Sequence, residues 1–418
     1  MRNRLLILLS IIVTSTIPVS LQAQRYFNSP LSRFNLGTFE KSGSFRSLGM
    51  GGTGMAIRTN DNLYSANPAS YSALDTNSFV FDFAVDYSIL SLSDNDRSYT
   101  SDDIGFNHLT MGFPVAKNFG VALGIEPYSN SYYNLSKNDE FGSSVDHHGN
   151  GGLTKIFIGT GAEMFEGLSL GLNMNILYGE ITRENYYLYK DSRVNNILSS
   201  EYLFLKGLVF DAGIQYGMEF ENGYFFNIGA GTTFGNDLKS NYSIRAETYN
   251  TAITNTLYHF SDDSTKAVLP NSLNAGISFG IADKLVLAAD YLYSAWSGAK
   301  IYGAEDCLAD SRSLRFGVEY IPDKYSYSSL VDRFEYRLGF HIDNNYLKIG
   351  SGQVKDYGIT GGIGIPMRRS YSKVNLFIDY SRKSVPSGSS VTHLEDCLTF
   401  GISMNIYENY WFVKTRFE

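Results

Sequence analysis

The sequence is poor in the residues that build metal-binding, redox or nucleic-acid-binding domains. Among its 418 residues there are only two cysteines, far apart and in no metal or redox motif. Charged residues make up 18% of the chain, the formal net charge is -8, and no basic run is present. We therefore predict no nucleic-acid partner, because binding to phosphates requires clustered lysine and arginine. We also predict no metal and no cofactor.

Long apolar runs are missing as well. After residue 23 no stretch approaches the roughly 18 apolar residues that a transmembrane helix needs. Residues 1–23 resemble a secretory signal peptide, with Arg2 and Arg4 before an apolar stretch and Leu21-Gln22-Ala23 as the cleavage site. A secreted chain of this kind can cross a membrane only with strands closed into a barrel, because unpaired backbone groups cannot face lipid.

What the sequence has instead is alternation. In Phe79–Ser91, FVFDFAVDYSILS, aromatic and aliphatic residues share one parity while Asp82 and Asp86 share the other. Such a period of two predicts a β-strand with one apolar and one polar face. Similar alternation predicts about 14 strands, at 79–91, 105–115, 119–131, 153–163, 168–180, 204–218, 224–234, 271–281, 285–295, 312–320, 334–342, 355–365, 374–382 and 396–406.

The connections between these strands alternate in length. Long ones lie at 92–104, 132–152, 181–203, 235–270, 296–311, 343–354 and 383–395, and shorter ones lie between them. Outer-membrane barrels have long extracellular loops and short periplasmic turns. We therefore predict an all-β fold, a transmembrane antiparallel β-barrel over 79–406 with a tail at 407–418. Its location would be the bacterial outer membrane, where outer-membrane lipid and lipopolysaccharide surround it.

Residues 24–78 do not alternate and are rich in glycine and serine. The lumen-facing parity of the strands is mostly small, so the barrel is predicted to have room inside. Either the lumen is an open water channel, or residues 24–78 form a hatch that occupies it.

Charged and polar residues on the lumen parity suggest how a hatch would be held. Our hypothesis is that they pair with hatch arginines such as Arg46, because buried charges require partners. A solvated lumen without specific pairing is the alternative. The lumen-facing candidates are Asp82, Asp86, Asp290, Arg315, Glu319, Arg337, His341 and Asp379.

Two further features concern the wall. Pro127 lies in the third predicted strand and removes a ladder donor, so the wall either kinks there or the strand ends there. The last strand resembles the signal that barrel assembly machinery reads during insertion. Its candidate residues are Thr399, Gly401, Met404 and Ile406.

The Gly-rich stretch FRSLGMGGTG, followed by Asn-Pro-Ala and then the barrel, resembles the FadL family of outer-membrane transporters. The matching hatch residues are Arg46, Gly49, Gly51, Gly52, Gly54, Asn67, Pro68 and Ala69. The resemblance implies a plugged barrel that binds and takes up hydrophobic small molecules such as fatty acids or hydrocarbons. We predict no enzyme, because no spacing signature joins the histidines, serines and aspartates of the sequence into a catalytic triad. The same broad family includes PorV, a secretion shuttle. The alternative is therefore a non-transporting barrel subunit that binds an outer-membrane protein partner in a secretion or assembly complex.

Overall fold

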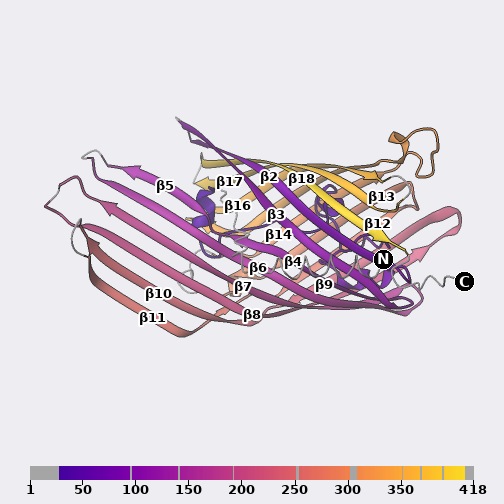
Figure 1. Cartoon of the computed structure of the whole chain (residues 1–418), viewed down its shortest axis with the longest axis horizontal. Coiled ribbons are helices and arrows are strands. Elements are labelled where there is room, and N and C mark those ends of the chain that lie inside the picture. The colour runs from indigo at the N-terminus through magenta and orange to yellow at the C-terminus, as the bar shows by residue number, and fades with distance from the viewer. Residues whose placement is uncertain are drawn as a thin grey trace, which may run out of the picture.

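The computed structural model describes residues 28–94, 97–139, 142–191, 193–250, 254–301, 308–350, 352–367, 370–387 and 390–409. They form a closed antiparallel barrel of 14 wall strands, which confirms the predicted fold class (Figure 1). The wall strands are β2 (Phe79–Asp94), β3 (Arg97–Ala116), β4 (Phe119–Asn130) continued by β5 (Tyr133–Asn138), β6 (Ser144–Phe165), β7 (Leu168–Leu188), β8 (Asn196–Glu219), β9 (Tyr224–Phe234), β12 (Ser272–Ile281), β13 (Leu285–Ser294), β14 (Ser311–Tyr320), β15 (Glu335–Ile349), β16 (Gly352–Pro366), β17 (Lys373–Ser387) and β18 (Ser390–Glu408).

The last wall strand closes the barrel on the first. β18 pairs with β2, with Ile402 opposite Val85. Both of these side chains belong to the apolar parity, which faces outward along the whole wall. Ile228, Ile277, Phe316 and Ile402 are each about half exposed. Among the described residues, no helix has the length and apolar character needed to cross a membrane.

The strands are longer than predicted at the end with the long connections, called here the outer end. The predicted loops 92–104, 181–203 and 343–354 are largely hairpin strand, since β7 runs to Leu188 and β8 begins at Asn196. Alternation does not mark these extensions because many of their side chains are polar on both faces. β18 also runs to Glu408, into the predicted tail. The predicted signal peptide, Cys307 and residues 410–418 lie outside the described residues.

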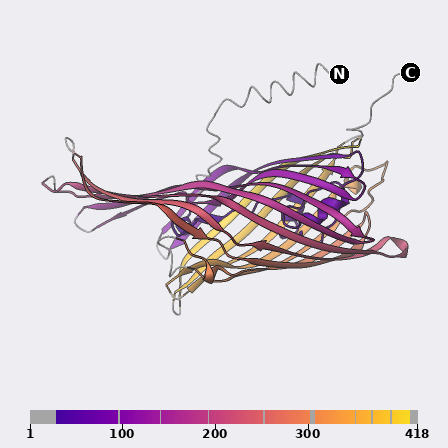
Figure 2. The same ribbon diagram turned by 90° about the horizontal axis from the view of Figure 1, so that it is seen from below.

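An inserted hairpin interrupts the wall at the outer end. β9 pairs directly with β12, and between them the chain forms β10 (Asp237–Tyr249) and β11 (Thr254–Val268). β10 takes over the pairing with the upper part of β8, and β11 pairs along its length with β10. Together with β5 and the outer parts of β6 to β8, this hairpin forms a sheet that projects beyond the barrel, called here the blade (Figure 2).

Hatch residues 28–78 lie inside the barrel. Their elements are the short helices η1 (Pro30–Arg33), α2 (Phe45–Leu48) and η2 (Pro68–Ala73) and the two-residue strand β1 (Thr38–Phe39). β1 adds antiparallel to β4 from the inside. The remaining short helices lie in connections of the wall and are η3 (Glu221–Gly223), η4 (Trp296–Gly298) and η5 (Val331–Arg333).

Candidate functional site

A buried set of ion pairs joins the hatch to the wall. Arg46 on α2 binds Glu319 of β14 through Nε, 2.9 Å from Oε2, and Nη2, 2.5 Å from Oε1. Arg337 of β15 donates to the same Glu319 Oε2 over 2.7 Å. Glu319 and Arg337 have side chains that are at most 1% exposed. The carboxylate is therefore held between two guanidinium groups, one from the hatch and one from the wall.

The set continues with a second hatch carboxylate. Asp61 lies 3.3 Å from Arg46 Nη1 and 2.5 Å from the ammonium of Lys373 at the start of β17. Lys373 and Arg337 also both pair with Glu335. Three carboxylates thus face three cations, which is the pairing that allows charge to be buried. This hatch ion cluster consists of Arg46, Asp61, Glu319, Glu335, Arg337 and Lys373.

Other predicted lumen residues bind the backbone of the glycine-rich stretch. Asp290 Oδ2 accepts hydrogen bonds from the amides of Gly54, at 2.7 Å, and Met55, at 2.9 Å. Arg315 donates to the carbonyl oxygen of Gly52 over 3.0 Å. Polar groups of the wall therefore add to the hydrogen bonds that this loop makes within itself, such as that from the Gly52 amide to the Ser47 carbonyl oxygen.

Asn67-Pro68-Ala69 forms the start of η2. The side chain of Asn67 accepts from the Ala69 amide at 3.2 Å and so caps the helix, while Pro68 occupies the first turn. The side-chain amide group of Asn67 also donates hydrogen bonds to the carbonyl oxygens of Met55, at 2.7 Å, and Ile214, at 3.2 Å. One side chain therefore joins two hatch segments to strand β8.

The small residues of the lumen parity face the hatch rather than an open channel. A Cβ built on any of seven wall glycines would overlap the hatch backbone or the Asn67 side chain. This glycine belt consists of Gly120, Gly161, Gly171, Gly213, Gly229, Gly317 and Gly339. Of the two alternatives, open lumen or occupied lumen, the structure therefore has the second.

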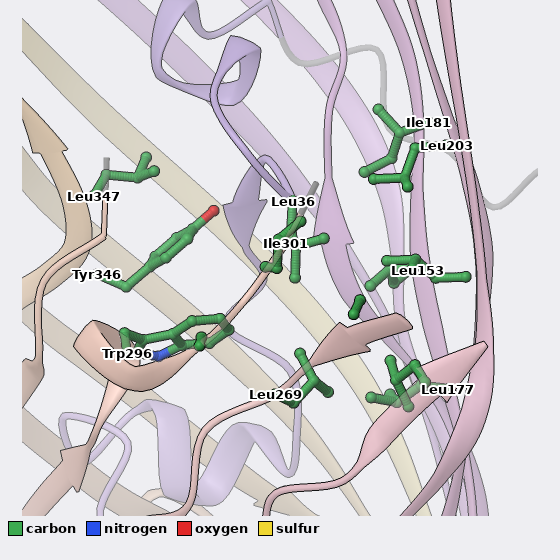
Figure 3. Packing of buried hydrophobic residues seen from close by; sticks show 14 of the residues in the cluster. Leu36, Leu153, Leu177, Ile181, Leu203, Leu269, Trp296, Ile301, Tyr346 and Leu347 are labelled. Atoms are coloured by element: carbon green, nitrogen blue, oxygen red, sulfur yellow. The ribbon is translucent and has the colours of Figure 1, made fainter. Parts of the chain in front are cut away.

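An apolar core closes the lumen toward the outer end. Leu36 of the hatch packs with Leu153 of β6, Trp296 of η4 and Tyr346 of β15 (Figure 3). Phe39 of β1 contacts this core, with its ring centroid 5.1 Å from that of Trp296 and 4.5 Å from that of Tyr346. We call this group of residues the mouth core.

Below the mouth core lies a polar pocket of about 250 Å³ between the hatch and the wall. It is lined by Lys41 of the hatch and by His341 and Asp379 of the wall, among others. Lys41 Nζ lies 2.8 Å from Asp379 Oδ2 and 3.0 Å from His341 Nε2. Charged groups therefore surround this part of the lumen.

Asp82 and Asp86 lie on β2, which is separated from β17 by β18 alone. Asp82 is 3.2 Å from Nε2 of His108, and Asp86 accepts a hydrogen bond from Asn107 over 2.8 Å. Both carboxylates are almost fully buried. They hold β2 and β3 together on the lumen side and are not part of the hatch ion cluster.

Pro127 marks a seam in the wall. The pairing of β3 with β4 runs only as far as Leu109 opposite Ile125, and the register with β6 shifts between Pro127 and Ser129. Beyond that point Ser129 and Asn130 of β4 pair with β1 as well as with β6. Asn28 of the hatch fills the seam, because its side chain bonds the backbone of Asn134 on β5 and lies 3.5 Å from the Tyr99 hydroxyl on β3.

The candidate assembly-signal residues lie on β18. The Thr399 and Ser88 hydroxyls are 2.9 Å apart, and Met404 is 44% exposed on the outer face, two residues before Ile406. Gly401 faces the ring of Phe45, which would overlap a larger side chain there. The glycine of this motif therefore also makes room for the hatch.

Several residues that take part in contacts between the hatch and the lumen wall were not among the sequence candidates. They are Lys41, Asp61, Asp343, Asp356, Thr360 and Lys373. Asp343 was assigned to a loop, and the hatch has no periodicity that would show which way Lys41 or Asp61 points. Thr360, which accepts from the Gly51 amide, was on the inward parity of its strand but is uncharged.

A sequence model of the BamG family matches residues 1–418, which is the whole chain. The chain belongs to the BamG family. No curated protein sequence matched this BamG-family chain.

Solved structures show the same fold as this BamG-family barrel. The CymD monoaromatic hydrocarbon channel has a TM-score of 0.57 at 15% identity, over 90% of this chain and 100% of its own. A Pseudomonas aeruginosa FadL homologue has a TM-score of 0.60 at 11% identity, over 89% and 99%. The Pseudomonas putida toluene transporter TodX has a TM-score of 0.56 at 14% identity, over 90% and 99%. The fold of the BamG-family chain is therefore FadL-like.

Proposed function

We propose that this chain is a closed outer-membrane barrel that serves as a subunit of a protein assembly rather than as a conduit. The observation that carries the proposal is the filled lumen. The hatch ion cluster binds the hatch to β14 and β17. The glycine belt packs against the hatch backbone, and the mouth core covers the hatch at the outer end. The polar pocket beside Lys41 has charged groups in its lining, and these suit a hydrocarbon poorly because burying charge against apolar groups is costly.

The blade supplies the contact surface in this proposal. β11 is exposed on most of its length, and Figure 1 shows it at the rim of the blade. Leu257 is 61% exposed and Tyr258 is 53% exposed. Thr254–Phe260 contains no Asp, Glu, Lys or Arg, whereas charged residues follow at Asp262 and Asp263.

An exposed edge strand is a template for another strand, and charges along an edge normally prevent such pairing. The uncharged part of β11 lacks this protection. The partner in our proposal is therefore an extracellular protein that adds an extended segment to β11, with pockets for Leu257 or Tyr258.

Shortening the inserted hairpin tests this function. Arg245 and His259 are opposite each other in the β10–β11 ladder, so residues 246–258 can be replaced by an Asn-Gly turn. We expect the barrel to fold, since β9 and β12 still pair, and a stoichiometric protein partner seen by native mass spectrometry with the unaltered chain to be lost.

The control shortens the neighbouring hairpin instead, replacing residues 188–196 by the same turn between the paired residues Tyr187 and Ile197. It should keep the partner, because it leaves β11 untouched. Loss of the partner in both variants, or in neither, would contradict docking on β11. An unaltered chain that carries no protein partner would contradict the subunit function itself.

The second candidate is uptake of hydrophobic small molecules, which the likeness to hydrocarbon channels and the seam at Pro127 favour. A ligand would have to displace part of the mouth core and leave where β3 and β4 separate. If the chain has this function, the purified barrel should bind radiolabelled oleate or toluene saturably, and Asn28→Trp, which enlarges the residue in the seam, should slow uptake by vesicles several-fold. A barrel that binds neither compound above the level of empty detergent would exclude this candidate.

A further inference from the structure

Four side chains surround the ammonium group of Lys41 in the polar pocket. His341 and Asp343 lie on β15, Asp356 on β16 and Asp379 on β17. Asp343 and Asp356 are opposite each other in the ladder, and His341 precedes Asp343 by two residues, so all three share the lumen face. Two carboxylates directly opposite each other repel unless a cation lies between them. We call His341, Asp343, Asp356 and Asp379 the lysine cage.

The hydrogen bonds of His341 define where a cation can bind. Nδ1 lies 2.8 Å from Asp343 Oδ2, and Nε2 lies 3.0 Å from the Lys41 ammonium. An ammonium group only donates, so Nε2 accepts and its lone pair points to Lys41. Nδ1 then donates to Asp343, which is how a carboxylate orients a metal-binding histidine. Lys41 thus occupies the direction in which a neutral imidazole would bind a metal ion.

The carboxylates have unused acceptor atoms. Asp356 is only 4% exposed, and its Oδ1 has no hydrogen-bond partner among the described residues. The Oδ1 of Asp343 is likewise buried without such a partner. At the place that the Lys41 ammonium occupies, His341 Nε2 is 3.0 Å away and Asp379 Oδ2 is 2.8 Å away. The Lys41 ammonium is 3.8 Å from Asp356 Oδ2, which is too long for a strong hydrogen bond.

The charge around Lys41 also leaves room for a second positive charge. Asp343, Asp356 and Asp379 carry three negative charges around the single charge of the Lys41 ammonium. Exchange of this ammonium for a divalent ion would reduce the excess of negative charge.

We propose that the lysine cage binds a divalent transition-metal ion through His341 Nε2, Asp356 and Asp379, in competition with the ammonium of Lys41, while Asp343 holds Nδ1 of the imidazole. One imidazole with carboxylates suits Zn²⁺ and related ions better than Mg²⁺ or Ca²⁺, which prefer oxygen ligands alone. Metal binding therefore releases Lys41, and with it the segment of the hatch that follows β1.

The experiment is a calorimetric titration of the purified full chain in detergent with Zn²⁺. We expect one ion per chain, at least about tenfold weaker binding for His341→Gln and for Asp356→Asn, and about tenfold tighter binding for Lys41→Met, which removes the competitor. His148→Gln is the matched control, since His147 and His148 on β6 are the other histidines close enough in sequence to bind a metal together. This control should leave the affinity unchanged.

Hydrogen exchange distinguishes the cage from a metal site elsewhere. Saturation with Zn²⁺ should speed exchange of the amides at 40–44 several-fold and leave those of η2 unaffected. Heat-dependent migration on a gel verifies that each variant is folded. Equal affinity in Lys41→Met and the unaltered chain, or loss of binding in His148→Gln but not in His341→Gln, would overturn the proposal.

Discussion

Replacing Glu319 by alanine should lower the free energy of unfolding by about 3–5 kcal/mol and free the hatch from the wall. The change leaves Arg46 and Arg337 buried, and both lose the carboxylate that binds them at 2.5–2.9 Å. Removal of one partner from a buried ion pair costs this much because the other charge stays desolvated. Chemical unfolding in lipid vesicles measures the free energy, and limited proteolysis within residues 46–61 reports release of the hatch.

An exposed ion pair provides the control. Arg193 and Asp191 lie 2.7 Å apart near the end of β7, with side chains 87% and 44% exposed. Hydrogen bonds from Arg193 hold the pKa of Asp191 below its usual value, so this carboxylate is charged at neutral pH. Asp191→Asn should nevertheless leave stability almost unchanged, because solvent screens an exposed ion pair. If Glu319→Ala costs no more than Asp191→Asn and leaves the hatch resistant to protease, the cluster does not hold the hatch.

Gly339→Leu should displace the hatch and destabilise the barrel by about 3 kcal/mol. This value is the upper part of the usual range for overpacking a protein interior. A Cβ on Gly339 would overlap the amide nitrogen of Gly51, and backbone of the hatch cannot move aside as a flexible side chain can. Amide exchange at residues 49–55 should rise at least about tenfold relative to the unaltered chain.

Gly298→Leu is the matched control, because nothing lies within 4 Å of a Cβ built there. It should leave exchange in the hatch unchanged. Equal exchange at residues 49–55 in both variants would show that the glycine belt does not press on the hatch.

The wall of the barrel was predictable because the difference between an apolar outward face and a polar or small inward face repeats from strand to strand. Phe83, Ile277 and Phe316 face outward, and Asp82, Ser278 and Arg315 face inward, and a period of two records this difference directly. The outer extensions escaped the same analysis. In β11 most side chains are exposed, on both faces of the strand, so the two faces differ little and the pattern carries no information about pairing.

The site was predictable only in part. Parity placed Glu319, Arg337 and His341 on the lumen face, but it cannot say which of them meet, since that depends on register and on the path of the hatch. The hypothesis that Arg46 pairs with the wall named the hatch side of the cluster. Lys41 and Asp61 have no repeating context, so nothing in their neighbourhood shows that they enter ion pairs.

The hatch contacts have a consequence for the order in which the protein folds. Arg46 meets Glu319 across 273 positions, Gly51 meets Thr360 across 309, and Lys41 meets Asp379 across 338. Contacts this distant in the chain form late, because the intervening loop must first be closed at an entropic cost. The segment that is made first therefore reaches its native place only when the last strands arrive. The barrel closes around its own N-terminal segment, so the hatch contacts and the pairing of β18 with β2 form together.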